Sequence, residues 1–172
     1  MNPYVDLAQK TIQTFLGEDR EISPPKGLPK EMLTKKAGVF VSLHHKKNHS
    51  LRGCIGSYFC RYENIAQEII KNAISAAVSD PRFPPLSLEE LPAIEISVDV
   101  LSQPEPIEGP KSLDPKKYGV IVKTKDGRTG LLLPDILGIS DAGYQVAIAR
   151  RKAGILPFED IYLYRFTVER YK

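Results

Sequence analysis

Hydrophobic positions recur with two different spacings along this sequence, and the spacing predicts where helices and strands lie. Apolar residues first fall on one helical face between Asn2, which is followed by a proline, and Gly17. Asn64 then opens a second helix with a face rich in isoleucine and alanine, and Asp80, which precedes another proline, ends it. A third helix is predicted over residues 141–153.

Alternating apolar and polar residues predict strands, and short turns between them predict antiparallel pairing. The alternation is clearest over residues 94–100. An Asp-Gly pair at 126–127 lies between two β-prone runs, which is a strong hairpin signal because a type I′ turn needs positive φ. Residues 102–117 are rich in proline and are expected to form a loop. The predicted strands are residues 39–43, 50–58, 94–100, 118–124, 128–133 and 161–171.

Helices mixed with antiparallel hairpins favour an α+β fold, a mainly antiparallel sheet with flanking helices, over a doubly wound parallel sheet. The 172 residues suit one domain or two small lobes sharing a core. With 42% hydrophobic residues, such a chain needs no disulfide or metal to fold. Its two cysteines, Cys54 and Cys60, and the lack of a long apolar run indicate a cytoplasmic protein. A net charge of +3 is too small to indicate a nucleic acid or membrane partner.

The segment from Leu51 to Gly56 is the most informative for chemistry. In a regular strand Arg52 and Cys54 share a face, and Gly56 leaves room beside the thiol. A guanidinium next to a thiol favours the thiolate, so a lowered pKa is expected for Cys54. Glycines inside a strand, here Gly53 and Gly56, often mark a bulge or the close approach of a ligand. The alternative is that Cys54 is a small buried hydrophobe and Arg52 a surface charge.

A second segment, Asp80 to Pro85, contains three prolines, which stiffen it. A rigid loop at a helix end can present Asp80 and Arg82 to a ligand with little loss of entropy. The alternative is a plain helix stop in which Asp80 pairs with Arg82 and Phe83 fills the core.

The basic run at the end of the last helix and the three histidines before Cys54 could each have a structural role and no ligand. Arg150, Arg151 and Lys152 complement the dipole at a helix end, unless Lys152 turns toward an anionic ligand. Three histidines, at positions 44, 45 and 49, precede the two cysteines. Their spacing matches no known pair arrangement of zinc ligands, so no metal site is predicted. Phosphate-binding loops, dinucleotide glycine fingerprints and nucleophile elbows are absent from the sequence.

Four short segments of the chain form an ordered set: Leu51–Gly56, Asp80–Pro85, Gly130–Pro134 and Lys152–Gly154. Together they resemble the signature stretches of the AMMECR family. The similarity runs from about Gly38 to Phe166, and the helix before Gly154 is most similar to the prokaryotic branch, the AmmeMemoRadiSam system. Many relatives carry a cysteine near the last stretch, where this chain has Arg150 and Arg151.

The resemblance implies one AMMECR-type domain over residues 1–172, with two intimately packed lobes and a cleft between them. It implies no established activity and no known cofactor. Prokaryotic members are associated with a Memo-like protein and a radical S-adenosylmethionine protein, so the resemblance points to these as partners.

Two hypotheses for function follow from the residues and the resemblance together. In the first, a cleft binds an anionic small molecule or acts on it, with Cys54 as nucleophile or thiolate ligand, Arg52 as its activator and Asp80 as an orienting or proton-accepting group. In the second, a non-catalytic module docks the Memo-like or radical S-adenosylmethionine partner, with Arg52 and Arg82 as anchors. The candidate ligand-binding residues are Arg52, Gly53, Cys54, Gly56, Asp80, Arg82 and Lys152.

Overall fold

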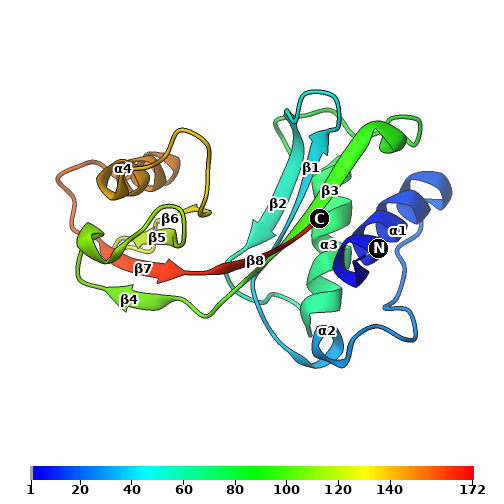
Figure 1. The fold of residues 1–172 in the computed structure, drawn as a ribbon, viewed down its shortest axis with the longest axis horizontal. Helices are drawn as coiled ribbons and strands as arrows, with labels where there is room; N and C mark the ends of the chain where they lie inside the picture. The colour runs from blue at the N-terminus through cyan, green and yellow to red at the C-terminus, as the bar shows by residue number, and fades with distance from the viewer. Residues whose placement is uncertain (1) are drawn as a thin grey trace. The chain divides into compact units, whose positions relative to one another are not determined.

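The computed structural model describes residues 2–172 and confirms the α+β fold, with two four-stranded sheets and packed helices (Figure 1). No helix among these residues is long and apolar enough to span a bilayer. The helices are α1 (Pro3–Glu18), α2 (Lys30–Thr34), α3 (Ile65–Val78) and α4 (Ala142–Lys152), with short 3-10 turns at Leu91–Ala93 and Pro110–Ser112. The strands are β1 (Val39–His45), β2 (Leu51–Ser57), β3 (Ile94–Leu101), β4 (Glu105–Ile107), β5 (Gly119–Lys123), β6 (Thr129–Leu132), β7 (Tyr162–Phe166) and β8 (Val168–Tyr171).

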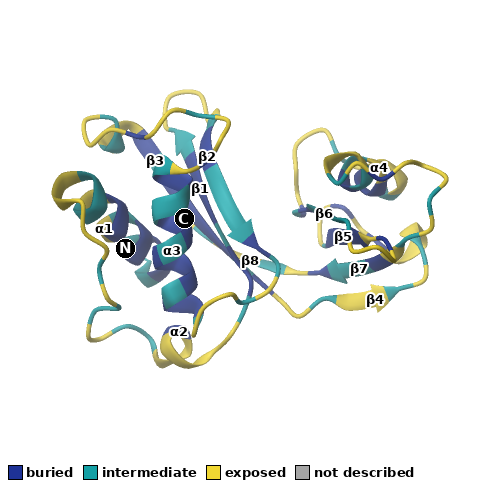
Figure 2. Cartoon of the chain, turned by 180° about the vertical axis from the view of Figure 1, so that it is seen from behind, coloured by how far each residue is buried: buried dark blue, intermediate teal, exposed yellow. Residues whose placement is uncertain are grey.

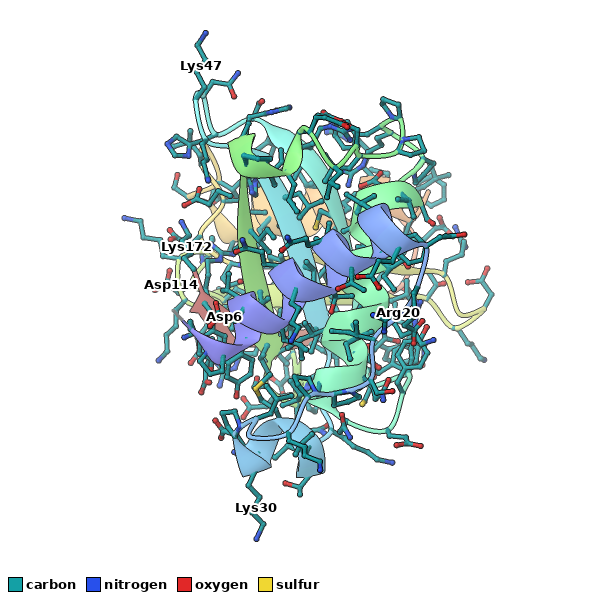
Figure 3. All side chains as sticks on the ribbon, turned by 90° about the vertical axis from the view of Figure 1, so that its right-hand side faces the viewer. Asp6, Arg20, Lys30, Lys47, Asp114 and Lys172 are labelled. Atoms are coloured by element: carbon teal, nitrogen blue, oxygen red, sulfur yellow. The ribbon has the colours of Figure 1, made fainter. Side chains whose placement is uncertain are left out.

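The first sheet has the strand order β2-β1-β3-β8, and β1 pairs antiparallel with both β2 and β3. Alternate residues of β1, Val39, Val41 and Leu43, are fully buried in a core shared with α1 and α3. Figure 2 shows β1 and β3 in the buried colour along most of their length. In Figure 3, α1 crosses in front of α3, and Lys47 in the hairpin turn lies at the opposite end of this unit from Lys30 of α2.

Side-chain caps fix where the two long helices of this sheet begin, as the sequence predicts. The Asn2 side chain accepts a hydrogen bond from the backbone N–H of Tyr4, and Asn64 accepts one from the N–H of Gln67, each at 3.0 Å. Helix α1 continues one residue beyond the predicted stop, because Asp19 adopts the left-handed conformation, with φ of 48°, that closes the helix.

The second sheet has the order β4-β7-β5-β6, and α4 packs against it. A Cβ atom added to Gly130 in β6 would come within 1.9 Å of the Ala149 carbonyl oxygen, so this glycine lets α4 lie directly on the sheet. The Asp141 side chain caps α4 by accepting from the Tyr144 N–H at 2.7 Å. Strand β4 lies within the segment that the sequence predicts to be a loop.

The chain divides into two compact units: residues through Val100 together with Glu169–Lys172, and Leu101–Val168. The single strand predicted over 161–171 is therefore two strands, since β7 belongs to the second sheet and β8 to the first. The implied close packing of two lobes and the cleft between them stay predictions.

Candidate functional site

The signature segment Leu51–Gly56 lies in β2, the edge strand of the first sheet. Its pairing with β1 is regular where Ser42 faces Cys54 and Leu43 faces Gly53, but the next pair is His44 with Leu51. Arg52 is therefore the extra residue of a β-bulge, where the strict alternation that the sequence analysis assumes is interrupted.

Both glycines of the segment are required by packing. A Cβ on Gly53 would lie 2.2 Å from the carbonyl oxygen of Ala76 in α3, so Gly53 lets the helix approach the strand. A Cβ on Gly56 would lie 2.4 Å from the ring of Phe40 in β1. The prediction that Gly56 leaves room for a ligand beside the thiol is wrong, because Phe40 occupies that space.

Arg52 is buried, and its guanidinium binds the segment that follows α3. Nε and Nη2 donate to the two carboxylate oxygens of Glu90 at 3.2 Å each. Nη1 donates to the Pro84 carbonyl at 2.9 Å, and Nη2 also reaches the Pro85 carbonyl at 3.4 Å. Arg52 thus fastens residues 84–90 to the sheet edge, and the prediction that it activates Cys54 is wrong.

The Cys54 thiol is half-buried, and Ser42 Oγ donates a hydrogen bond to its sulfur at 3.2 Å. Burial raises the pKa of Cys54 above its ordinary value, and the Ser42 hydrogen bond and the charge of Arg82 offset only part of that rise. The expected lowered pKa is therefore corrected: Cys54 is protonated at neutral pH. The nearby cation is Arg82, which the sequence analysis assigned to the ligand instead.

Asp80 and Arg82 close the outer edge of β2 at the position of Cys54. The buried Asp80 carboxylate accepts from the Cys54 N–H at 2.9 Å and from Arg82 Nε and Nη2 at 3.0 and 2.7 Å. Arg82 Nη2 also donates to the Cys54 carbonyl at 3.3 Å. The Arg82 hydrogen bond is the main reason that the pKa of Asp80 lies well below its usual range. Such a carboxylate is a poor proton acceptor, so the proton-accepting role predicted for Asp80 is not supported.

This part of the structure matches the alternative given for the proline-rich segment, a helix stop in which Asp80 pairs with Arg82. Phe83 is only half-buried, and the Arg82 guanidinium lies over its ring at 5.5 Å from the centroid. The pair also covers an exposed strand edge, which protects it from pairing with other chains.

Comparison with known proteins identifies the family. The family model AMMECR1 matches residues 5–171. The chain belongs to the AMMECR1 family.

Relatives of this AMMECR1-family chain include a Thermotoga maritima protein that is 51% identical, over 99% of this chain and 98% of the relative. A Clostridium acetobutylicum protein is 46% identical over 99% of this chain, which covers only 36% of that longer relative. The crystal structure of the uncharacterized protein PH0010 from Pyrococcus horikoshii has a TM-score of 0.89 and 39% identity, covering 97% of this chain and 88% of that one.

The AMMECR1 fold also brings together polar side chains that the sequence analysis did not assign to a site. Ser97 in β3, Ser42 in β1 and Cys54 in β2 pair across neighbouring strands, so they form one row on the sheet face opposite α1 and α3. Beside this row the buried Asp99 binds Arg170 of β8 through two hydrogen bonds, at 2.8 and 2.9 Å. The alternation over residues 94–100 predicts that Ser97 and Asp99 share a face of the sheet. The sequence does not predict the strand register that places Ser42 and Cys54 next to Ser97.

Two other predicted features of the AMMECR1 chain take no part in the contacts described above. Lys152 belongs to the second unit, where its Nζ donates to the Leu131 carbonyl at 2.8 Å, so its place in the site stays a prediction. His44 pairs with Leu51 in the sheet, whereas His49 lies in the turn, 3.5 Å from a Glu95 carboxylate oxygen. Within residues 2–172, no three histidine, cysteine or acidic side chains gather as a metal site would require.

Proposed function

We propose that this AMMECR1-family chain binds an anionic small molecule, carrying a carboxylate or phosphate group, at the sheet face around Cys54. The proposal is for binding without covalent chemistry. A nucleophilic thiol needs a lowered pKa or an adjacent base, and here burial raises the pKa of Cys54 while Asp80 is held as a stable carboxylate. Arg52 is occupied by Glu90 and backbone carbonyls.

One observation carries the proposal: Arg82 is exposed and yet held in place. Its side chain is 55% exposed, while that of its partner Asp80 is 2% exposed. Nε and Nη2 bind Asp80 and the Cys54 carbonyl, and Nη1 makes no hydrogen bond to any residue in the range 2–172. A guanidinium fixed by its neighbours, with an unused pair of N–H groups, suits an oxyanion because little entropy is lost on binding.

The row of small polar side chains gives the rest of such a ligand hydrogen-bonding partners. The Ser42 and Ser97 hydroxyls each combine a donor with acceptor lone pairs, and the Cys54 thiol is a weak donor. Ser42 and Ser97 come from the central strands β1 and β3, which are fixed by pairing on both sides, and both are buried at 7% exposure. Arg82 is therefore the accessible part of the proposed site.

An NMR titration of backbone amides with inorganic phosphate and a panel of small carboxylates tests the proposal. We expect saturable shifts at the Cys54 and Arg82 amides and at least a tenfold weaker affinity in Arg82→Gln. We expect no change in Arg20→Gln, because Arg20 is an exposed arginine that pairs with Glu18. Unshifted amides with the whole panel, or equal affinity in Arg82→Gln with the fold intact, would contradict it.

Docking of a Memo-like or radical S-adenosylmethionine partner on the same surface stays a prediction. If Arg82 is the anchor, Arg82→Gln abolishes co-purification of that partner, and co-purification at wild-type yield would count against this surface.

A further inference from the structure

A groove of about 460 Å³ runs beside α4 in the second unit, and it shares no residue with the Cys54 site. Its floor is apolar, because Val146 and Ile155 are buried members of the second core. Along the helix, Gly143 and Ala147 are one turn apart and face the groove, so at these two positions no long side chain blocks the approach of another backbone.

One wall of the groove is the loop after α4, and polar contacts hold that loop in place. Arg150 Nη1 donates to the carbonyls of Leu156 and Glu159 at 2.8 and 3.0 Å. The Glu159 carboxylate accepts from the Leu156 N–H at 2.7 Å and forms an ion pair with Arg128. The loop is therefore an ordered part of the unit.

This ordered loop holds large apolar side chains in water. Leu156 lines the groove and is 52% exposed. Phe158 follows two residues later in the same loop, beside the groove lining, and is 83% exposed. Figure 2 shows the loop after α4 mostly in the exposed colour. Because the loop backbone is already held, a partner that covers Leu156 and Phe158 does not have to order the loop, so little backbone entropy is lost on binding. Exposed apolar side chains on a held loop suit the role of interface anchors.

The charge at the groove indicates the nature of that molecule. Arg151 lines the groove, is exposed, and its side chain forms no ion pair or hydrogen bond within the described range 2–172. Arg150 and Lys152 flank it in sequence. A second copy of this chain would bring another such basic run against the first, and like charges at an interface are unfavourable.

We propose that this groove docks an amphipathic helix of a partner protein, with apolar residues on the face toward Leu156 and Phe158 and acidic residues toward Arg151. A helix laid along α4 matches the one-turn spacing of Gly143 and Ala147, which is the helix-in-groove mode of recognition.

The test uses the full chain and two fluorescent helical peptides with the same leucine face, one with glutamates and one with lysines on the flanks. We expect the glutamate peptide to bind at least tenfold more tightly in anisotropy titrations. Phe158→Ser is expected to weaken that binding at least tenfold, and Arg151→Glu to reverse the preference between the peptides. Leu137→Ser is the matched control, since Leu137 is a fully exposed leucine of the same unit that belongs neither to the groove nor to the loop after α4.

Several outcomes would overturn the proposal. Absence of binding by either peptide, equal binding of both, or an equal loss in Leu137→Ser would each do so. Self-association in sedimentation experiments that Phe158→Ser abolishes would assign the groove to a second copy. Retention on phosphatidylserine vesicles that Phe158→Ser abolishes would assign it to a lipid surface. None of these results bears on Arg82, so this proposal and the anion-binding proposal can fail separately.

Discussion

Replacing Arg52 with alanine separates a structural from a catalytic role for the signature arginine. If Arg52 only tuned a thiol, its removal would leave the fold as stable as before. In the structure Arg52 connects strand β2 to Pro84, Pro85 and Glu90, so its removal should release that segment from the sheet edge.

The loss can be sized from the contacts. The charge-assisted bond to the Pro84 carbonyl contributes about 2 kcal/mol, while the 3.4 Å contact to Pro85 is too long to count fully. The ion pair with Glu90 contributes about 1 kcal/mol or less, because the Glu90 side chain is 39% exposed and water replaces the lost partner. With the packing of the buried arginine stem, the free energy of unfolding should fall by about 3 kcal/mol.

Urea unfolding followed by far-ultraviolet circular dichroism measures this change. Arg20→Ala removes a similar side chain that is 60% exposed and is expected to alter the free energy of unfolding by less than about 0.5 kcal/mol. A similarly small loss in Arg52→Ala would refute the structural role and return Arg52 to the list of groups free to act on a ligand.

The same variant has a pH signature. The Arg52 hydrogen bond lowers the pKa of Glu90 below the ordinary value of 4.5. A depressed carboxyl pKa stabilises the fold above the ordinary value, and this stabilisation is lost as the pH falls through the folded-state pKa. The stability gap between wild type and Arg52→Ala should therefore be widest near neutral pH and shrink below about pH 4.

The remaining predictions concern neighbouring residues. Gly53→Ala should lower the free energy of unfolding by about 1–3 kcal/mol in urea, because the new methyl group meets the Ala76 carbonyl and the backbone must shift. Cys54 should be alkylated by iodoacetamide at pH 7.5 more slowly than a free cysteine, and Arg82→Gln should slow it further, because a stabilising charge is lost from the thiolate. The stabilisation that Asp80 contributes should be complete well above the ordinary aspartate pKa and should be lost progressively as the pH falls from about 4 toward the depressed pKa of the folded state; Asp80→Asn should lack that acid-dependent loss.

Controls and contrary results are available for each. Gly17→Ala, in a helix with ordinary contacts at 3.7 Å, should be neutral or slightly stabilising, and an equal loss there would remove the steric explanation for Gly53. Mass spectrometry must separate Cys54 from Cys60, and alkylation of Cys54 faster than that of free cysteine would restore the activated thiol. Identical acid profiles for wild type and Asp80→Asn would show that the carboxylate is not coupled to folding.

Local chemistry explains why most elements could be predicted from the sequence. Asn64 caps α3 where the capping pattern places it, and the Asp-Gly pair joins β5 and β6. Strand β8 could not be separated from β7, because alternation continues through Thr167 and only the pairing partners distinguish the two sheets. Pairing partners are set by tertiary contacts, which one sequence does not display.

The proximity of four candidate residues could be predicted from the sequence, but the way they pair could not, and their binding of a ligand stays a prediction. The sequence analysis predicted that Arg52, Cys54, Asp80 and Arg82 lie close together, and the structure brings all four to the edge of β2. The sequence predicted that Arg52 lies beside the Cys54 thiol. Instead, Arg52 is the extra residue of a bulge and pairs with Glu90, and Arg82 is the cation next to Cys54. A bulge shifts one residue of a strand without changing the amino-acid composition or the alternation of apolar and polar residues, so the sequence pattern does not predict it.

The return of the chain from β7 to β8 also makes the first unit depend on residues that lie far apart in the sequence. The hydrogen bonds between Asp99 and Arg170 join positions separated by 71 residues, and the whole second unit lies in the loop that they close. Closing a long loop costs entropy, so contacts of this kind form late in folding unless the intervening chain is already compact. Prior folding of the second unit shortens that loop, and the unit that begins at the amino terminus is then completed last.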